Sequence, residues 1–194
     1  MTTTIVLVRH GETDWNREHR FQGHADPPLN EAGRAQARAL AEELSQEPYA
    51  RVFSSPLRRA LETAEILAAG RGLEVETHAG LMEVDVGSWA GLTVSEVEAR
   101  FPDAYRSWME SRSGWTDGET YDELGHRVVS AVLDLAARNG HATLLGVTHG
   151  GPIRAVTAYT RGLPFAAGRA EIDHVVNCGV VRFAVHDGEI RPAS

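Results

Sequence analysis

The most constraining feature of this sequence is an apolar run near its start that ends in a cation and an imidazole. Residues 5–8 are Ile, Val, Leu and Val, and Arg9, His10 and Gly11 follow at once. An unbroken apolar run of this length is typical of a strand buried on both faces of a parallel sheet. Open α/β sheets bind ligands where such strands end. The run therefore predicts that Arg9 and His10 lie in a binding site.

Two later stretches repeat this arrangement. Residues 52–56 lead into two adjacent arginines, Arg58 and Arg59, and residues 144–148 lead into His149. If the three strands are parallel neighbours, two histidines and two arginines meet at one edge of the sheet. Guanidinium groups match the geometry of phosphate oxygens. The sequence therefore predicts a phosphate site at this edge.

Helix geometry decides between the two arginines. Ser55 is expected to cap a helix with Pro56 at its first position, which puts both arginines in the first turn. Consecutive helical residues point about 100° apart, so only one arginine faces the pocket. Because Arg58 has Glu62 four residues later as an ion-pair partner, Arg59 is predicted to face the pocket.

The remaining elements are expected to alternate in the manner of an α/β fold. Helices are predicted over residues 30–46 and 121–138 and from Gly150 onward. Strands are predicted over residues 175–178 and 180–185, antiparallel at the edge of the sheet. The last six residues are expected to be dispensable.

Length and charge narrow the class of protein. The chain has 194 residues, enough for one domain with a full core, and its formal charge of −8 argues against nucleic acid and acidic membranes as partners. Its one cysteine, Cys178, cannot form an internal disulfide. The apolar run before Arg9 is too short for a signal peptide or a membrane span. A cytoplasmic enzyme is therefore expected.

The polar segment 12–28 is expected to rise above the sheet, where loops carry function. Its aromatic residues Trp15 and Phe21 either pin the segment to the core or accompany residues that touch a ligand. In the second reading, the contacts are made by Asn16, Gln22 and Gly23.

Two further irregular segments leave similar alternatives open. Glu83 and Asp85 lie among glycines, and they are either ordinary surface carboxylates or the source of a catalytic acid. Residues 92–119 carry two short helical patterns and are expected to form a lid-like insertion. Its residues Trp108, Arg112 and Trp115 either read the substrate or only pack the lid.

The charges of the predicted cluster determine its chemistry. Neither His10 nor His149 has the spacing of a metal-ligand pair, so no metal is assigned. Neighbouring cations should lower the pKa of His10 and leave a lone pair that can attack phosphorus at neutral pH. Arg9 and Arg59 would hold the phosphoryl oxygens, and Glu83 is the natural candidate for the acid that protonates the leaving oxygen.

Five segments in a fixed order carry a resemblance to a known family. They are residues 7–13, 20–23 with 28–30, 54–60 with Thr63 and Ala64, 81–83 with Gly87, Trp89 and Gly91, and 148–151. Together they resemble the histidine phosphatase superfamily, the phosphoglycerate-mutase-like enzymes. Residues 24–26 depart from the threonine-rich version that is familiar in that family.

The resemblance implies the fold and the roles of the site residues. The fold would be a three-layer α/β sandwich over residues 1–194, with a mostly parallel central sheet, an antiparallel edge strand and helices on both faces. His10 would be the residue that is phosphorylated, and Glu83 would be the proton donor. The phosphate would be held by Arg9, Arg59, His149, Asn16 and Gly150, with Gln22 and Gly23 lining the pocket. The resemblance implies no cofactor.

The sequence thus predicts a metal-independent phosphomonoesterase that hydrolyses a small phosphorylated metabolite through a phosphohistidine on His10. Two alternatives are a cofactor-dependent phosphoglycerate mutase and a non-catalytic phosphate-binding regulatory module. A nucleophile together with an acid favours an enzyme over a module. The short segment between Gly91 and Glu119 favours a phosphatase over the mutases of the family, which are longer there. The substrate does not follow from the resemblance, and a homodimer is left open.

Overall fold

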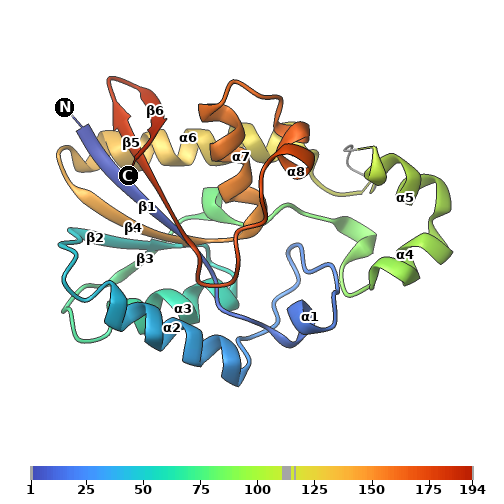
Figure 1. Ribbon diagram of the computed structural model, residues 1–194, viewed down its shortest axis with the longest axis horizontal. Coiled ribbons are helices and arrows are strands. Elements are labelled where there is room, and N and C mark those ends of the chain that lie inside the picture. The colour runs from blue at the N-terminus through green and yellow to red at the C-terminus, as the bar shows by residue number, and fades with distance from the viewer. Residues whose placement is uncertain (1, 111–114, 116, 194) are drawn as a thin grey trace.

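The computed structural model describes residues 2–110, 115 and 117–193, and a six-stranded sheet lies at its centre (Figure 1). The strands are β1 (Thr2–Arg9), β2 (Arg51–Ser54), β3 (Val75–Thr77), β4 (Thr143–Thr148), β5 (Val180–His186) and β6 (Glu189–Pro192), in the spatial order β3-β2-β4-β1-β5-β6. The first four are parallel to one another, and β5 is antiparallel to both of its neighbours, β1 and β6. The predicted mostly parallel sheet is confirmed.

The packing of β1 explains why its apolar run is unbroken. Val6 and Val8 pack with α2 (Glu31–Glu43) and α3 (Arg58–Ala68), whereas Ile5 and Leu7 pack with α6 (Tyr121–Asn139) and α7 (Gly150–Thr160). Successive side chains of a strand point to opposite faces, so a strand covered on both sides needs apolar residues throughout. These four side chains are at most 2% exposed, and burying each contributes about 1.5–3 kcal/mol. Helices on both faces make the predicted three layers.

The strand ends that the sequence singled out lie side by side. Arg9 of β1 is paired with Thr148 of β4, and Ser54 of β2 is paired with Val147 of the same strand. His10, His149 and the start of α3 therefore meet at the carboxyl ends of parallel strands. The loops above this edge include the short elements α1 (Asp14–Arg17), η1 (Ala79–Leu81) and η2 (Gly87–Trp89).

The predicted insertion contributes two helices that stand outside the three layers. They are α4 (Val94–Arg100) and α5 (Pro102–Met109), and Figure 1 shows them beyond the carboxyl ends of the parallel strands. Thr93 begins α4 with a capping box, because its hydroxyl accepts from the Glu96 N–H and its own N–H donates to the Glu96 carboxylate. After α7 the chain forms η3 (Phe165–Ala167) and α8 (Gly168–Glu171).

Two of the predicted helix boundaries are wrong. The helix α3 begins at Arg58 with Leu57 as its N-cap residue, so Ser55 does not cap it. The Ser55 hydroxyl accepts from the Leu57 N–H at 3.3 Å, before the helix begins, and bonds to His149 Nε2 at 2.8 Å in a tertiary contact. The helix α2 ends at Glu43 and is followed by turns, three residues earlier than its apolar pattern suggested.

Expectations about the C-terminal segment are also wrong. Residues 175–178 form no strand. The Val175 carbonyl accepts a hydrogen bond from the Arg9 side chain, and the chain turns at Cys178, whose φ is 57°. The last six residues, expected to be dispensable, include the strand β6, which pairs with β5 and buries Ile190 at 5% exposure. The antiparallel strand β5 accordingly lies one place in from the edge of the sheet.

Candidate active site

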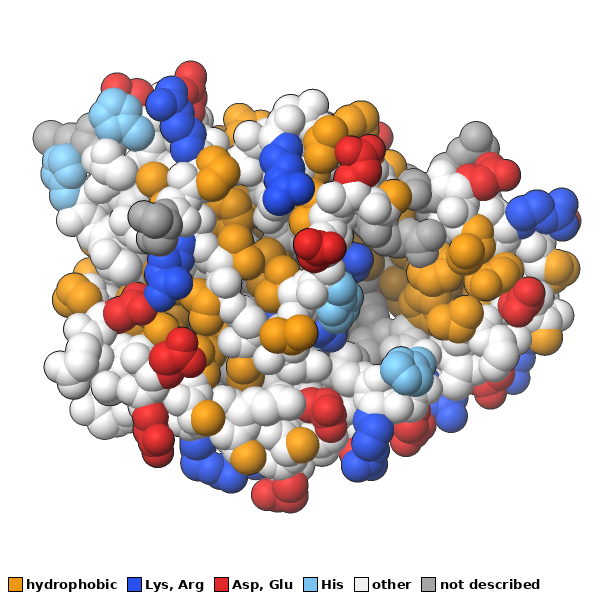
Figure 2. Space-filling view, in the orientation of Figure 1, with side chains coloured by type: hydrophobic (Ala, Val, Ile, Leu, Met, Phe, Trp, Pro, Cys, Tyr) orange, Lys and Arg blue, Asp and Glu red, His pale blue; other side chains and the backbone are white. Residues whose placement is uncertain are grey.

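A cavity of about 350 Å³ opens at the carboxyl ends of the parallel strands. Figure 2 shows the hollow, with hydrophobic side chains of the α4–α5 segment along one side. Its lining includes seven of the nine predicted site residues, namely Arg9, His10, Asn16, Gln22, Gly23, Arg59 and Glu83. The ring of His149 lies behind, 5.1 Å from the ring of His10, and Gly150 lies beside the Arg9 side chain. The nine residues therefore share one site, and their roles stay predictions.

His10 follows β1 directly and is held in one tautomer. Its Nδ1 lies 2.7 Å from the Gly11 carbonyl oxygen, which can only accept, so Nδ1 carries the proton and Nε2 keeps a lone pair. Burial, and then the charges of Arg59 and Arg9, hold the pKa of His10 well below its usual value. The expected direction is confirmed, although burial is a larger cause than the two cations. A neutral imidazole with a free nitrogen is the form that can act as a nucleophile.

His149 follows β4 directly, as the N-cap residue of α7, and is fully buried. Its Nε2 bonds to the Ser55 hydroxyl, and its Nδ1 has no hydrogen-bond partner among the described residues. Burial lowers the pKa of His149 well below its usual value, and the nearby charges of Arg59 and His10 lower it further. This ring is therefore neutral at pH 7 and presents one nitrogen without a protein partner.

Main-chain carbonyls orient the two arginines. Arg59 donates from Nη1 to the Ala25 carbonyl and from Nη2 to the Gly23 carbonyl, both at 2.8 Å, and Gly23 turns there at a φ of 50°. Arg9 donates from Nη1 to the Val175 carbonyl at 2.8 Å. Burial lowers the pKa of Arg59 to about 10, so the side chain is still a cation at pH 7. In both arginines Nε is buried without a partner among the described residues.

Four buried polar atoms of the site have no hydrogen-bond partner among the described residues. They are Arg9 Nε, Arg59 Nε, His149 Nδ1 and Gln22 Oε1. Buried polar groups in folded proteins are otherwise nearly all hydrogen-bonded. Three of the four are nitrogens that can donate to an anion, and two of these belong to cations. An oxyanion with several acceptor oxygens satisfies such a set.

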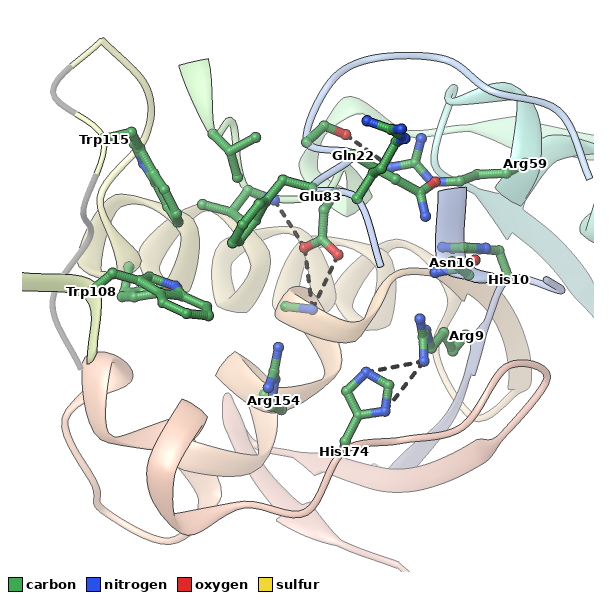
Figure 3. A pocket seen from close by; sticks show the side chains of 17 residues that line it. Arg9, His10, Asn16, Gln22, Arg59, Glu83, Trp108, Trp115, Arg154 and His174 are labelled. Atoms are coloured by element: carbon green, nitrogen blue, oxygen red, sulfur yellow. Dashed lines mark hydrogen bonds between the residues drawn. The ribbon is translucent and has the colours of Figure 1, made fainter. Parts of the chain in front are cut away.

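Glu83 reaches this site from the loop between η1 and η2. Its Oε1 accepts from the Gly151 N–H at 3.2 Å, and its main-chain carbonyl accepts from Arg127 Nη2 at 3.2 Å and lies 2.9 Å from His24 Nε2. The carboxyl therefore lies at the wall of the pocket, as Figure 3 shows. Asp85 does not line the pocket, because its side chain accepts from the Gly87 N–H within the loop.

The loop that carries Glu83 is fixed by an ion pair from α6. Arg127 donates from Nε and Nη2 to the two carboxylate oxygens of Glu119, each at 2.7 Å. Its Nη1 donates to the carbonyls of Gly80 and Met82. Arg127 therefore positions the loop through its ion pair with Glu119 and its bonds to the loop carbonyls, and it does not line the pocket.

Comparison with known proteins places this site in a family. The model of the histidine phosphatase superfamily (branch 1) matches residues 5–193. The chain belongs to this superfamily. It is 40% identical over 190 residues to phosphoglycerate mutase-like protein 4 of Arabidopsis thaliana, which is 95% of this chain and 80% of that one. It is 37% identical over 154 residues to phosphoserine phosphatase 1 of Hydrogenobacter thermophilus, which is 78% and 73% of the two chains.

Solved structures agree with the assignment. The mycobacterial glucosyl-3-phosphoglycerate phosphatase Rv2419c matches with a TM-score of 0.86 at 35% identity, over 97% of this chain and 95% of that one. The predicted family and fold are confirmed.

The aromatic residues of this histidine phosphatase both pack and line the pocket. Trp89 is 1% exposed and makes edge-to-face contacts with Phe21, Trp108 and Trp115. Trp108, Trp115 and Phe21 also line the cavity. The packing role of Trp108 and Trp115 is therefore confirmed, and their contact with a substrate stays a prediction. Arg112 lies outside the described residues.

The predicted division between the two helical arginines is confirmed. Arg58 pairs with Glu62 at 2.8 Å on an exposed face, whereas Arg59 is fully buried and lines the cavity. Asn16 also lines the cavity, and its Oδ1 accepts from Thr13 and from Asn177 Nδ2. The remaining donor of Asn16 is its amide Nδ2, the group that suits a phosphate oxygen.

Several residues of the site were missed from sequence. Ser55 orients His149, and Asn177 donates from Nδ2 to the His10 carbonyl at 2.9 Å. Arg154 and His174 line the cavity. The signal for Ser55 was present but was assigned to a helix cap. Arg154 lies in a helix interior, Asn177 lies in a segment that resembled a strand, and His174 precedes that segment, and no local pattern distinguishes the three.

The described residues hold no group of three or more His, Cys, Asp or Glu side chains that could bind a metal ion. In the same part of the chain, no helix combines the length and apolarity that crossing a membrane requires.

Proposed function

We propose that this protein is a metal-independent phosphomonoesterase that hydrolyses a small phosphorylated metabolite through a phosphoenzyme on His10. The observation that carries the proposal is the set of buried donors without partners around a neutral His10. Such a set has a use only when an oxyanion is bound beside the nucleophile. A non-catalytic phosphate-binding module would need neither this nucleophile nor Glu83.

In the first step, His10 Nε2 attacks phosphorus, the N–P bond forms and the ester P–O bond breaks. Arg9, Arg59 and His149 hold the non-bridging oxygens, with Asn16 and the Gly150 backbone as further contacts, and they offset the charge of the transferred group. Glu83 gives its proton to the leaving alkoxide, whose own pKa is far above 7. The products of this step are the alcohol and phosphorylated His10.

In the second step, water attacks the same phosphorus and the N–P bond breaks. Glu83, now a carboxylate, takes the proton of the water, and inorganic phosphate leaves with His10 neutral again. The aromatic residues of the lid, over residues 92–119 of a single domain, would cover the alcohol part of the substrate. Relatives named for phosphoserine and for glucosyl-3-phosphoglycerate and a cavity of about 350 Å³ support a metabolite-sized phosphate ester as substrate.

Hydrolysis of p-nitrophenyl phosphate in excess chelator tests the proposal. The wild type should turn over with chelator present, and Arg59→Gln should lose roughly 10²–10³-fold in kcat. Arg58→Gln is the matched control, because that side chain pairs with Glu62 outside the pocket and should leave the rate within about twofold. Activity that chelator abolishes and a divalent ion restores contradicts the proposal, as does binding of inorganic phosphate without any turnover.

A further inference from the structure

One arginine of the pocket has neither an assignment in the reaction nor an ion-pair partner among the described residues. Arg154 projects into the cavity from α7, one turn after the Gly150–Gly151 start, and it makes no hydrogen bond or ion pair with the described residues. His174 lies on the same wall of the pocket, opposite Gln22 and Arg59, as Figure 3 shows. The charge of Arg154 is close enough to lower the pKa of both Arg9 and His174. An unpaired cation beside another cation is unfavourable unless an anion joins them.

The charges around the cavity leave room for a second anionic group. Among the described residues, its lining contains four arginines and one carboxylate, that of Glu83. Arg20 is neutralised by Glu18 at 2.7 Å and by Glu96 at 3.2 Å. A phosphate monoester brings about −1.5 to −2 charges, which Arg9 and Arg59 balance. Because the proposed reaction uses Glu83 as a proton donor and not as a counter-ion, the charge of Arg154 is left over.

The position of Arg154 relates it to the alcohol part of the substrate. Glu83 must reach the bridging oxygen, so the alcohol lies on the far side of Glu83 from His10. The Glu83 carboxyl bonds to the Gly151 N–H, and Gly151 and Arg154 are three residues apart on one face of α7. A group a few bonds from the bridging oxygen therefore comes within reach of the guanidinium.

His174 adds a neutral hydrogen-bonding group to this wall. Burial, and then the charges of Arg9 and Arg154, lower the pKa of His174, so its ring is uncharged at pH 7. Its Nε2 lies 3.1 Å and its Nδ1 lies 3.4 Å from Arg9 Nη1, which can only donate, so one ring nitrogen accepts from Arg9 and the other carries the proton. The ring N–H is a neutral donor next to the anion that Arg154 would bind.

We propose that Arg154 and His174 form a carboxylate subsite, so that the substrate is a phosphorylated hydroxy acid or amino acid. The inference rests on the proposed phosphatase function and extends it to a substrate class. A carboxylate supplies the single negative charge that remains to be balanced, and its two oxygens match the two donors of a guanidinium edge. The names of the relatives, phosphoserine phosphatase and glucosyl-3-phosphoglycerate phosphatase, denote substrates with a carboxylate.

Two substrates that differ only at the carboxylate provide the test. In 3-phosphoglycerate a carboxylate stands where glycerol 3-phosphate has a hydroxymethyl group, and both esters release a primary alkoxide. The wild type should prefer 3-phosphoglycerate in kcat/KM, and Arg154→Gln should lower kcat/KM for it by about 10- to 100-fold. The same variant should leave glycerol 3-phosphate and p-nitrophenyl phosphate within about threefold.

Arg161→Gln is the matched control, because it removes an exposed cation from the end of the same helix outside the cavity. It should retain the preference for the carboxylate. Equal kcat/KM of the wild type for the two alkyl esters overturns the subsite, as does an equal effect of Arg154→Gln on both. If the wild type hydrolyses none of the three esters, the proposed function is overturned, and the subsite with it.

Discussion

The substitution Gly151→Ala should displace the carboxyl of Glu83, the proposed acid, and leave the rest of the site in place. A Cβ on Gly151 would lie 2.2 Å from Glu83 Oε1, whereas its next contacts, with the Glu83 carboxyl carbon and with Leu124, are at 3.3 Å. The carboxyl must therefore retreat by roughly 1 Å to reach ordinary van der Waals separation. It is the end of a flexible side chain, so it can move without disturbing the core.

The expected effect of Gly151→Ala is a loss of activity without a loss of stability. A misplacement of about 1 Å costs on the order of 100-fold in rate, which corresponds to about 2.7 kcal/mol in the activation barrier. Alanine is a better helix former than glycine by up to about 1 kcal/mol, so Tm should hold or rise. The loss should fall on alkyl phosphates, whose leaving oxygen needs a proton, and should spare p-nitrophenyl phosphate.

Steady-state kinetics on both esters, with a thermal melt of each variant, measure these effects. Gly168→Ala is the control, because its added methyl would meet only ordinary contacts of 3.4 to 3.6 Å, away from the pocket. An unchanged rate on alkyl phosphates would refute the placement of Glu83 as the acid, and so would equal losses on the two esters.

Three further predictions concern the acid, the histidines and the acceptor. Glu83→Gln should impair alkyl phosphates far more than p-nitrophenyl phosphate, while Asp85→Asn should affect both weakly; a reversed order in kcat would contradict this. Because the pKa of His10 and of His149 is held below 6.5, the unfolded chain binds protons that the native state does not, and the free energy of unfolding should fall below about pH 6.5. Each histidine lowers the free energy of unfolding by up to about 1.4 kcal/mol per pH unit. Urea titrations at several pH values should show a shallower pH dependence in His149→Asn than in the wild type, and an equal dependence would contradict this prediction. With 3-phosphoglycerate and a catalytic amount of 2,3-bisphosphoglycerate, phosphate should be released faster than 2-phosphoglycerate is formed. Faster formation of 2-phosphoglycerate, measured by NMR, would indicate a mutase.

The part of the site that follows strand ends could be predicted from sequence. The unbroken apolar run at residues 5–8 and the largely apolar stretch at 144–148 mark strands covered on both faces. The residues that follow these two strands meet at one sheet edge. The ion pair of Arg58 with Glu62 is local in sequence, so the spacing of the two residues was enough to assign Arg59 to the pocket.

The rest of the site depends on tertiary contacts that leave no local pattern. Ser55 has the composition of a helix cap, yet its hydroxyl bonds to a histidine 94 positions away. Residues 175–178 have the composition of a strand, yet their backbone groups bond to Arg9 and its neighbours. Arg154 is an arginine in an ordinary helix, and only its place on the pocket wall distinguishes it from Arg161.

The central claim is that His10 carries the phosphoryl group during turnover. Rapid mixing with a substrate labelled in its phosphate, quenched in alkali to preserve phosphohistidine, should trap label on the wild-type protein in the presence of chelator. The label should be lost in acid, should map by mass spectrometry to the peptide that contains His10, and should be absent from His10→Ala. Label on another residue, or label of equal amount on His10→Ala, would contradict the account.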